Sequence, residues 1–453
     1  MSALAAKPPT WREVLHGERG RLIVGLLVLE TMFALHFLTI TTVMPAVLDD
    51  LGSIALYGWS FTAASLAQLA VIPVAGAAVD RFGPRVLTIL VAIAYTAGLI
   101  VAATAPSMGV VVAGRFLQGT ASGGAYALSL GVVAKALPER HRARVLALLA
   151  TTWLLPGLFG PPLGAVLAET VGWRFAFLVP FPVLVACLFM ILPSLRAITG
   201  TGAGTIPLGR PFVLMLGAGA FFGALTALSL LTLPVLIVGA IVALAALKGL
   251  VPAGTHRART GPAAAAVGAF LLSVAFVATE SFAPLMFTDV RMRALTEVAV
   301  VLAVTPFAWA GGSWWQSREV ERRSLAWLTA VAAAIVAVGL SLTAAGLMLG
   351  VPLAIAYTGW VVIALGMGIG FPTMPLAAMS AAGAGTEASD LSPTLLMDML
   401  GIAVGAGLGG ASLAIADRAG GGLTPGLAGA FAVSAVAVTL LFFVAPRIAT
   451  PAR

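Results

Sequence analysis

The sequence has little charge and almost no cysteine. Charged residues make up 9% of its 453 residues, against about 25% in a typical soluble domain, so the chain cannot present an ordinary water-facing surface. The single cysteine, Cys187, excludes internal disulfides and multi-cysteine metal sites. The four histidines are scattered and form no metal constellation, and no Walker A pattern is present. We therefore expect no metal, no cofactor, no enzyme and no ATP-driven pump.

Apolar residues and glycine are what the sequence has in excess. Apolar residues make up 60% of the chain, glycine accounts for 51 residues, and the mean hydropathy is +1.07. Apolar runs of about 20 residues recur throughout, which is the length of a membrane-spanning helix. They lack the period-two alternation of a membrane barrel, and glycine suits close helix packing in a bilayer. The sequence predicts an all-α polytopic membrane protein.

The apolar runs predict fourteen spans. Thr232 and Pro234 in "LLTLPVL" divide the run 211–251 into a tight hairpin. The spans lie near residues 21–43, 56–79, 86–105, 109–134, 144–168, 173–193, 211–230, 233–251, 263–287, 296–315, 325–348, 351–379, 393–416 and 425–446. This order gives a six-helix bundle in 1–195, a linker and extra hairpin in 196–260, and a second six-helix bundle in 261–453. The hairpin is interpreted as a spacer.

Lysine and arginine positions predict the orientation of the chain. Twenty of the 25 fall in segments on one side of the predicted membrane, four fall on the other side, and Arg115 lies within a span. Basic loops stay in the cytoplasm, so both termini are predicted to be cytoplasmic in a cell membrane. The same distribution explains the net charge of +8 without a nucleic-acid partner. The expected surroundings are the lipid bilayer, and the expected active form is a monomer.

The stretch "GAAVDRFGPRVLTIL", residues 76–90, places charges between the second and third spans. Gly76 is expected to permit close helix approach, and Gly83 is expected to supply the turn. The pattern resembles the signature loop of the major facilitator superfamily in position, side and spacing. This resemblance implies a fold of two six-helix bundles and a conformational latch made by Asp80, Arg81 and Arg85. A plain basic cytoplasmic turn is the alternative.

The stretch "GRFLQGTASGGAYALS", residues 114–129, carries a polar and small stripe on one helix face. Its members are Arg115, Gln118, Gly119, Ser122, Gly123 and Tyr126. The stripe should face the protein interior, because an arginine in a span costs about 2.5–3.5 kcal/mol on insertion scales. It resembles the superfamily's fourth-span motif, which implies that the arginine acts in proton transfer. A purely structural buried pair is the alternative.

The stretch "PGLFGPPLGAVL" resembles the fifth-span motif of antiporters in the superfamily. Its small and bent positions are Gly157, Gly160, Pro161 and Gly164, which allow a closely packed helix; generic packing is the alternative. The stretches 366–376 and 388–411 resemble spans twelve and thirteen of the fourteen-span drug:proton antiporter branch. That resemblance implies proton-coupled transport with protons as the coupling ion.

Five ionisable residues lie inside predicted spans and are candidates for proton coupling. They are Glu30, His36, Arg115, Glu280 and Asp398. Related antiporters carry an aspartate at the position of His36, so Glu30 and His36 are alternative proton carriers here. Asp398 is alternatively a helix-start anion or the partner of a loop arginine. The predicted function is export of lipophilic small molecules, including cations, in exchange for protons. A facilitator of one metabolite or lipid, and a membrane receptor or assembly factor, are the alternatives.

Overall fold

The computed structural model describes residues 17–136, 152–196, 198–200, 209–227, 229–252, 254–380 and 387–448. Within these ranges the regular elements are helices, and none is a strand. The all-helical prediction is therefore confirmed for the described part of the chain. The first residues of the predicted span 144–168, and Lys7, Arg12, Arg140, Arg142, Arg144 and Arg453, lie outside it.

Residues 17–196 form a first group of helices. They are α2 (Gly17–Leu51), α3 (Ile54–Phe82), α4 (Pro84–Ala103), α5 (Met108–Ala136), α7 (Leu154–Thr170), α8 (Trp173–Leu178) and α9 (Pro180–Ser194). Helices α8 and α9 form one apolar stretch of 22 residues. Proline lacks a backbone N–H and suits a first helical turn, which explains why α4 begins at Pro84 and α9 at Pro180.

The extra hairpin and a second group of helices follow. The hairpin consists of two separate helices, α10 (Gly209–Ala227) and α11 (Leu233–Lys248), as "LLTLPVL" predicts. The second group contains α12 (Pro262–Glu280), α13 (Ala283–Leu285), the π-helical η2 (Met286–Val290), α14 (Leu295–Glu319), α15 (Leu325–Ala344), α16 (Leu353–Ser380), α17 (Glu387–Arg418) and α18 (Leu423–Val444). Short 3₁₀ turns lie at η1 (Thr255–Arg257), η3 (Ala345–Leu347) and η4 (Ala445–Arg447).

Eleven of the described helical segments are long and apolar enough to cross a membrane. Each of them lies on a predicted span. Three further predicted spans coincide with α5, α7 and α11. The described part of α7 has 17 residues and α11 has 16, fewer than the roughly 20 that a straight span needs. The chain is therefore a multi-pass helical membrane protein, and the number fourteen stays a prediction.

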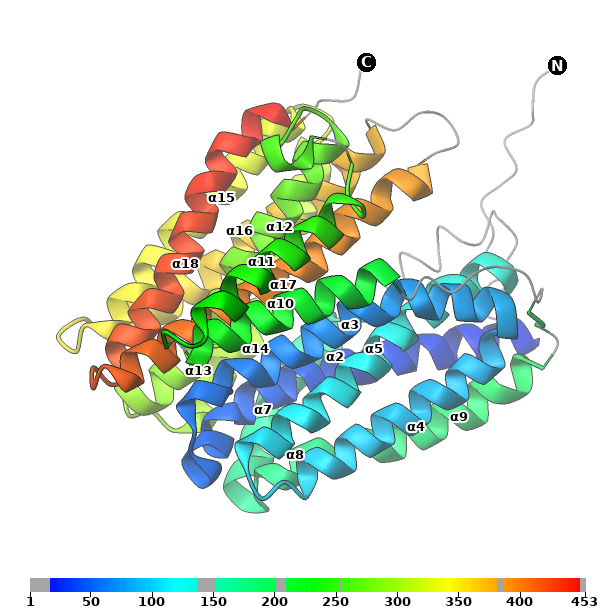
Figure 1. The fold of residues 1–453 in the computed structure, drawn as a ribbon, viewed down its shortest axis with the longest axis horizontal. Helices are drawn as coiled ribbons and strands as arrows, with labels where there is room; N and C mark the ends of the chain where they lie inside the picture. The colour runs from blue at the N-terminus through cyan, green and yellow to red at the C-terminus, as the bar shows by residue number, and fades with distance from the viewer. Residues whose placement is uncertain are drawn as a thin grey trace.

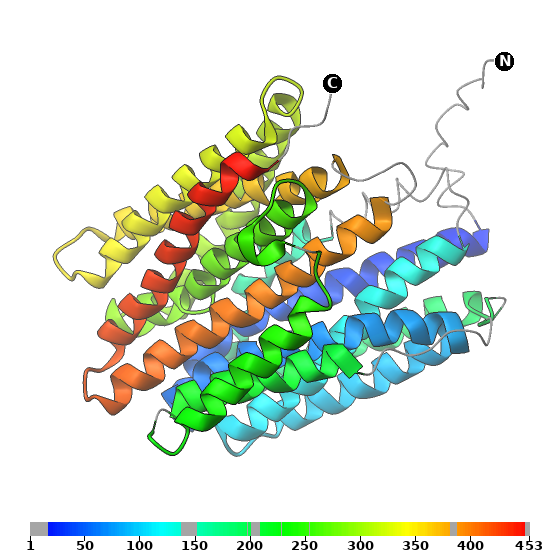
Figure 2. The same ribbon diagram turned by 45° about the horizontal axis from the view of Figure 1, so that its top comes forward.

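The helices form two groups that meet along a seam (Figures 1 and 2). Helix α3 of the first group packs against α17 of the second. Helix α10 packs against both of them, so the hairpin covers the seam. In both views the two groups lie close at one end and diverge toward the end where α2 begins and α18 ends.

Direct contacts join the two groups at the opposite end, remote from the start of α2 and the end of α18. Gly58 of α3 faces Gly410 of α17 so closely that a Cβ on either residue would overlap backbone atoms of the other. The Tyr57 hydroxyl donates to the Ser281 carbonyl at 3.2 Å. The backbone N–H of Thr296, in the first turn of α14, donates to the Glu169 carboxylate of α7 at 3.1 Å. The Glu169 carboxylate therefore accepts from one of the N–H groups that lack an intrahelical partner at a helix start in the other group.

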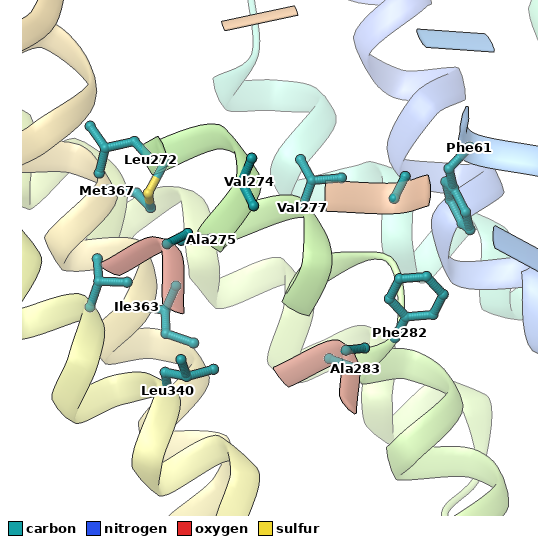
Figure 3. Close-up of a cluster of buried hydrophobic side chains, with 14 of the residues drawn as sticks. Phe61, Leu272, Val274, Ala275, Val277, Phe282, Ala283, Leu340, Ile363 and Met367 are labelled. Carbon is teal, nitrogen blue, oxygen red and sulfur yellow. The ribbon is translucent and has the colours of Figure 1, made fainter. Parts of the chain in front are cut away.

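The largest buried cluster spans the same seam (Figure 3). Leu272 of α12 lies beside Met367 of α16, and Phe282 lies near Phe61 of α3. Lipid tails are as apolar as these side chains, so water exclusion contributes little to holding helices together within a bilayer. Close van der Waals packing, which interdigitated side chains and glycine contacts provide, stabilises the cluster instead.

Candidate functional site

A half-buried carboxylate lies on α2, the first helix of the described residues. Glu30 of α2 accepts a hydrogen bond from the Ser129 hydroxyl of α5, with 2.7 Å between Oγ and Oε1. Glu30 lies nearer to the beginning of α2 than to its end, and Ser129 lies near the end of α5. Glu30 keeps part of its surface accessible, so it can exchange protons or contact a ligand while Ser129 holds its position.

A second carboxylate lies on the other side of the seam. Asp398 of α17 is buried and accepts a hydrogen bond from the Ser273 hydroxyl of α12. It lies well inside α17, which begins at Glu387, so a helix-start anion is the wrong description of it. Its hydrogen-bond donor is a serine within the bundle and not a loop arginine, as far as the described residues go.

Tyr126 is influenced electrostatically by both carboxylates. It is half-buried on α5, one turn before Ser129. Its hydroxyl lies within electrostatic reach of both Glu30 and Asp398. The first and second groups of helices therefore each contribute a carboxylate, held by a serine of the same group, to the surroundings of one tyrosine. We call Glu30, Tyr126, Ser129, Ser273 and Asp398 the carboxylate site.

His36 lies outside this site, in the packed interior of the first group. Its Nδ1 lies 2.6 Å from the Tyr95 hydroxyl of α4, and its ring packs edge-on against Tyr95 and Phe177. Its Nε2 is buried and has no hydrogen-bond partner among the described residues. Six residues separate His36 from Glu30 on α2, and the two side chains have different hydrogen-bond partners, Tyr95 and Ser129.

The Arg115 guanidinium is buried and donates hydrogen bonds to neutral oxygen atoms. Its Nε donates to the Ser60 carbonyl of α3 at 3.1 Å. One terminal nitrogen donates to Gln118 Oε1 at 2.8 Å, and the Gln118 amide in turn donates to the Gly98 carbonyl of α4 at 3.0 Å. Within the described residues no carboxylate forms an ion pair with Arg115. The guanidinium therefore ties three helices together, and its charge reaches His36 and Tyr95.

Glu280 stands apart from the other candidates. It is 8% exposed at the end of α12, and no hydrogen bond or ion pair to its carboxylate is found in the described ranges. It immediately precedes Ser281, whose carbonyl accepts the Tyr57 hydroxyl across the seam. The structure therefore places Glu280 beside the contact between the groups and not in the carboxylate site.

The charged turn between α3 and α4 is exposed at Asp80, Arg81 and Arg85. Gly83 has a φ of 86°, a backbone conformation that glycine adopts at no steric cost, and Pro84 begins α4. The turn geometry that the sequence predicts for Gly83 is therefore present.

The prediction that Gly76 permits close helix approach is wrong for the described chain. A Cβ placed on Gly76 would meet no described atom within 4 Å. The close approach at this turn lies instead at Gly83, where a Cβ would come within 3.0 Å of the Gly200 backbone nitrogen. Gly200 in turn lies against the backbone of Arg81.

Comparison with known proteins places these features in a family. The model of the Major Facilitator Superfamily matches residues 26–406. The chain belongs to the Major Facilitator Superfamily. It is therefore a membrane transporter and not an enzyme, and the resemblance carried by the loop at 76–90 is confirmed.

Superfamily relatives with efflux names match the whole chain or its parts. A probable multidrug-efflux transporter of Mycobacterium tuberculosis (strain ATCC 25618 / H37Rv) is 28% identical over 461 residues, which cover 96% of each protein. A multidrug resistance protein B homolog of the same strain is 35% identical over 178 residues, 38% of this chain and 33% of that protein.

Solved structures of the superfamily share the fold. A bacterial homolog of the human lysosomal transporter Spinster, in an inward-facing and unoccupied conformation, matches with a TM-score of 0.68 and 16% identity over 96% of this chain and 99% of that chain. A D-xylose-proton symporter matches with a TM-score of 0.66 and 11% identity over 94% and 98%. Identities this low show the fold alone.

In this Major Facilitator Superfamily member the fifth-span motif packs α7 against its neighbours. Gly160 lies against Leu38 of α2, and Gly164 against Thr39, whose hydroxyl donates to the Gly160 carbonyl at 3.2 Å. Gly157 faces Pro306 of α14, in the other group. Pro161 lies within the helix. The motif thus has a packing role on both sides of the seam.

The structure also adds site residues that sequence reasoning missed. Ser129 continues the stripe that includes Arg115 and Tyr126, because it lies fourteen residues after Arg115, close to four helical turns. That signal was available in the sequence. No sequence signal pointed to Tyr95 or Ser273, because their partners His36 and Asp398 lie on other helices.

Proposed function

We propose that this chain exports lipophilic small molecules, including cations, in exchange for protons. The observation that carries the proposal is the carboxylate site, where Glu30 and Asp398, each bonded to a serine of its own helix group, both act electrostatically on Tyr126. Removing water from a carboxylate raises the free energy of its charged form, so binding either a proton or a cation stabilises it. Proton and cation therefore compete for the same oxygens, and this competition is the physical basis of exchange.

Alternating access would use the two helix groups as its moving parts. The carboxylates belong to different groups, so a ligand between them feels any movement along the α3–α17 seam. Transporters of this kind hold their sites near the interface of two repeats that rock against each other. We assign the first bundle to 1–195, the hairpin and linker to 196–260 and the second bundle to 261–453. Fourteen spans, cytoplasmic termini and a monomeric active form are parts of the same proposal.

Gradient-driven uptake into proteoliposomes tests the proposal. Purified protein is reconstituted, a pH gradient is imposed, and accumulation of a fluorescent lipophilic cation such as ethidium is followed. We expect accumulation that stops when the gradient is collapsed by a protonophore. Accumulation that is unaffected by the protonophore would favour a facilitator, and its absence with every lipophilic probe would favour a receptor or assembly factor.

Cysteine labelling tests the proposed orientation. His256 lies exposed in the η1 turn after α11, and Ser107 lies exposed between α4 and α5. In a Cys187→Ala background, His256→Cys should resist an impermeant thiol reagent on intact cells and react after permeabilisation. Ser107→Cys should react on intact cells. Labelling of both cysteines on intact cells would mean that the hairpin does not cross the membrane twice, and the fully reversed pattern would mean that the chain is inverted.

Neutralising the charged turn should slow transport and spare binding. Asp80 is exposed at the end of α3, in the turn that leads to α4, and it is not one of the residues of the carboxylate site. We expect Asp80→Asn to lower the transport rate severalfold while substrate affinity stays within about threefold, a difference of less than 1 kcal/mol. Initial rates and equilibrium binding are measured on the same preparation. A large loss of affinity at an unchanged rate would refute the latch assignment.

A further inference from the structure

A small cavity lies between α2 and the α8–α9 stretch, on a side of α2 different from that of Glu30. Its volume is about 90 Å³. Helix α2 contributes Thr31, His36 and Thr39 to its lining, and the opposite wall includes Val179, Pro180 and Val183. The rest of the lining is hydrocarbon. The carboxylate site and the turn at 76–90 make no use of this cavity.

His36 supplies the cavity with an unsatisfied polar atom. Its side chain is 3% exposed and lines the cavity. Its Nδ1 is taken by the Tyr95 hydroxyl at 2.6 Å, whereas Nε2 is buried and lacks a partner among the described residues. A buried polar atom without a partner costs about 1–3 kcal/mol, so a ligand that supplies the missing hydrogen bond gains that amount of binding energy at most.

The size and chemistry of the cavity select its occupant. An apolar cavity of about 150 Å³ holds benzene, which has six heavy atoms, so the volume of about 90 Å³ at His36 suits about four heavy atoms. Three polar side chains, Thr31, His36 and Thr39, reach the lining, and the Thr39 hydroxyl already donates to the Gly160 carbonyl. The remaining walls are apolar and offer water no hydrogen bond, whereas they suit an alkyl chain. A short aliphatic chain that ends in a hydroxyl satisfies both the walls and Nε2.

We propose that this cavity binds the hydroxyl-bearing end of an uncharged lipophilic molecule, with the hydroxyl on His36 Nε2. A hydroxyl both donates and accepts, so it pairs with Nε2 whether Tyr95 donates to Nδ1 or accepts from it. The hydrocarbon walls exclude charged groups, which distinguishes this site from the carboxylate site. Binding here does not depend on proton-coupled export, so it stands even where transport fails.

Photolabelling of the purified protein in lipid nanodiscs tests the site. The probe is an aliphatic alcohol that carries a diazirine, and the matched control is the same diazirine alkane without the hydroxyl. Labelled peptides are mapped by mass spectrometry. We expect saturable labelling within 28–39 and 176–183 that 1-propanol competes away. The alkane should need an about fivefold higher concentration to reach half of its maximal labelling, since one neutral hydrogen bond is worth about 1 kcal/mol.

Two variants and a control separate the cavity from general partitioning. Val183→Phe fills the cavity and should remove the labelling. His36→Phe should lower labelling by the alcohol probe to the level of labelling by the alkane probe. Val238→Phe, on the exposed face of α11, should change nothing. Equal labelling by alcohol and alkane, no saturable labelling, or unchanged labelling in Val183→Phe would each overturn the proposal. Val183→Phe keeps the test decisive if His36→Phe does not fold.

Discussion

Replacing Glu30 with glutamine is expected to reduce pH-gradient-driven export to the level of empty vesicles. Glutamine has nearly the shape of glutamate and can still accept the 2.7 Å hydrogen bond from Ser129, so the local packing is preserved. It cannot bind and release a proton, however, and it carries no charge to attract a cation. Export of a lipophilic cation is measured in proteoliposomes with an imposed gradient. Folding is checked by gel filtration and thermal melting.

Ser129→Ala and His36→Asn are the matched controls for this result. Ser129→Ala removes the donor to Glu30 and keeps the carboxylate, so coupled export should persist. His36→Asn alters a side chain that contacts Tyr95 and not the carboxylate site, so it should shift the pH optimum and retain coupling. If Glu30→Gln kept full gradient-driven export and His36→Asn abolished it, His36 would be the titrating group.

Adding one methyl group at Gly119 is expected to disrupt the packing of α3 on α5. A Cβ on Gly119 would overlap the carbonyl and Cα of Ala64 in α3. These are backbone atoms within a helix, so neither can move aside cheaply, and overpacking of this kind costs about 1–3 kcal/mol. We expect Gly119→Ala to lower the melting temperature and the yield of folded protein. Transport should fall too, because Arg115 donates to the Ser60 carbonyl on the displaced helix.

Gly109→Ala provides the control on the same helix. The nearest described atom to its added Cβ would be the Ser107 hydroxyl at 4.0 Å, and alanine is the better helix former. The melting temperature should therefore stay the same or rise slightly. Equal losses of stability in Gly109→Ala and Gly119→Ala would contradict the assignment of the α3–α5 contact.

Sequence reasoning predicts the features that local composition encodes. Apolar length placed the eleven spans found in the described residues, and Thr232 with Pro234 divided α10 from α11. The stripe on α5 faces the protein interior, because Arg115, Gln118 and Gly119 are all buried. Each of these follows from a period or a run within one stretch of chain.

Features that depend on pairing between distant helices were not predictable in this way. The donor to Asp398 is Ser273 on another helix, and the partner of His36 is Tyr95, with no spacing that links them. The hairpin, interpreted as a spacer, has α10 packed on the seam between α3 and α17. The prediction for Gly76 was wrong because a glycine permits close packing only where a neighbouring helix is present, and no described atom lies within 4 Å of a Cβ placed there.

Substrate-driven proton movement tests the central claim most directly. Proteoliposomes containing the wild-type chain and a trapped pH indicator start with equal pH on both sides, and a lipophilic cation is then added to the outside. Exchange predicts that the lumen becomes more alkaline as cation enters, because each carboxylate that binds a cation has released its proton. The signal should be absent with Glu30→Gln. Entry of the cation into wild-type vesicles without any change in internal pH would contradict the account.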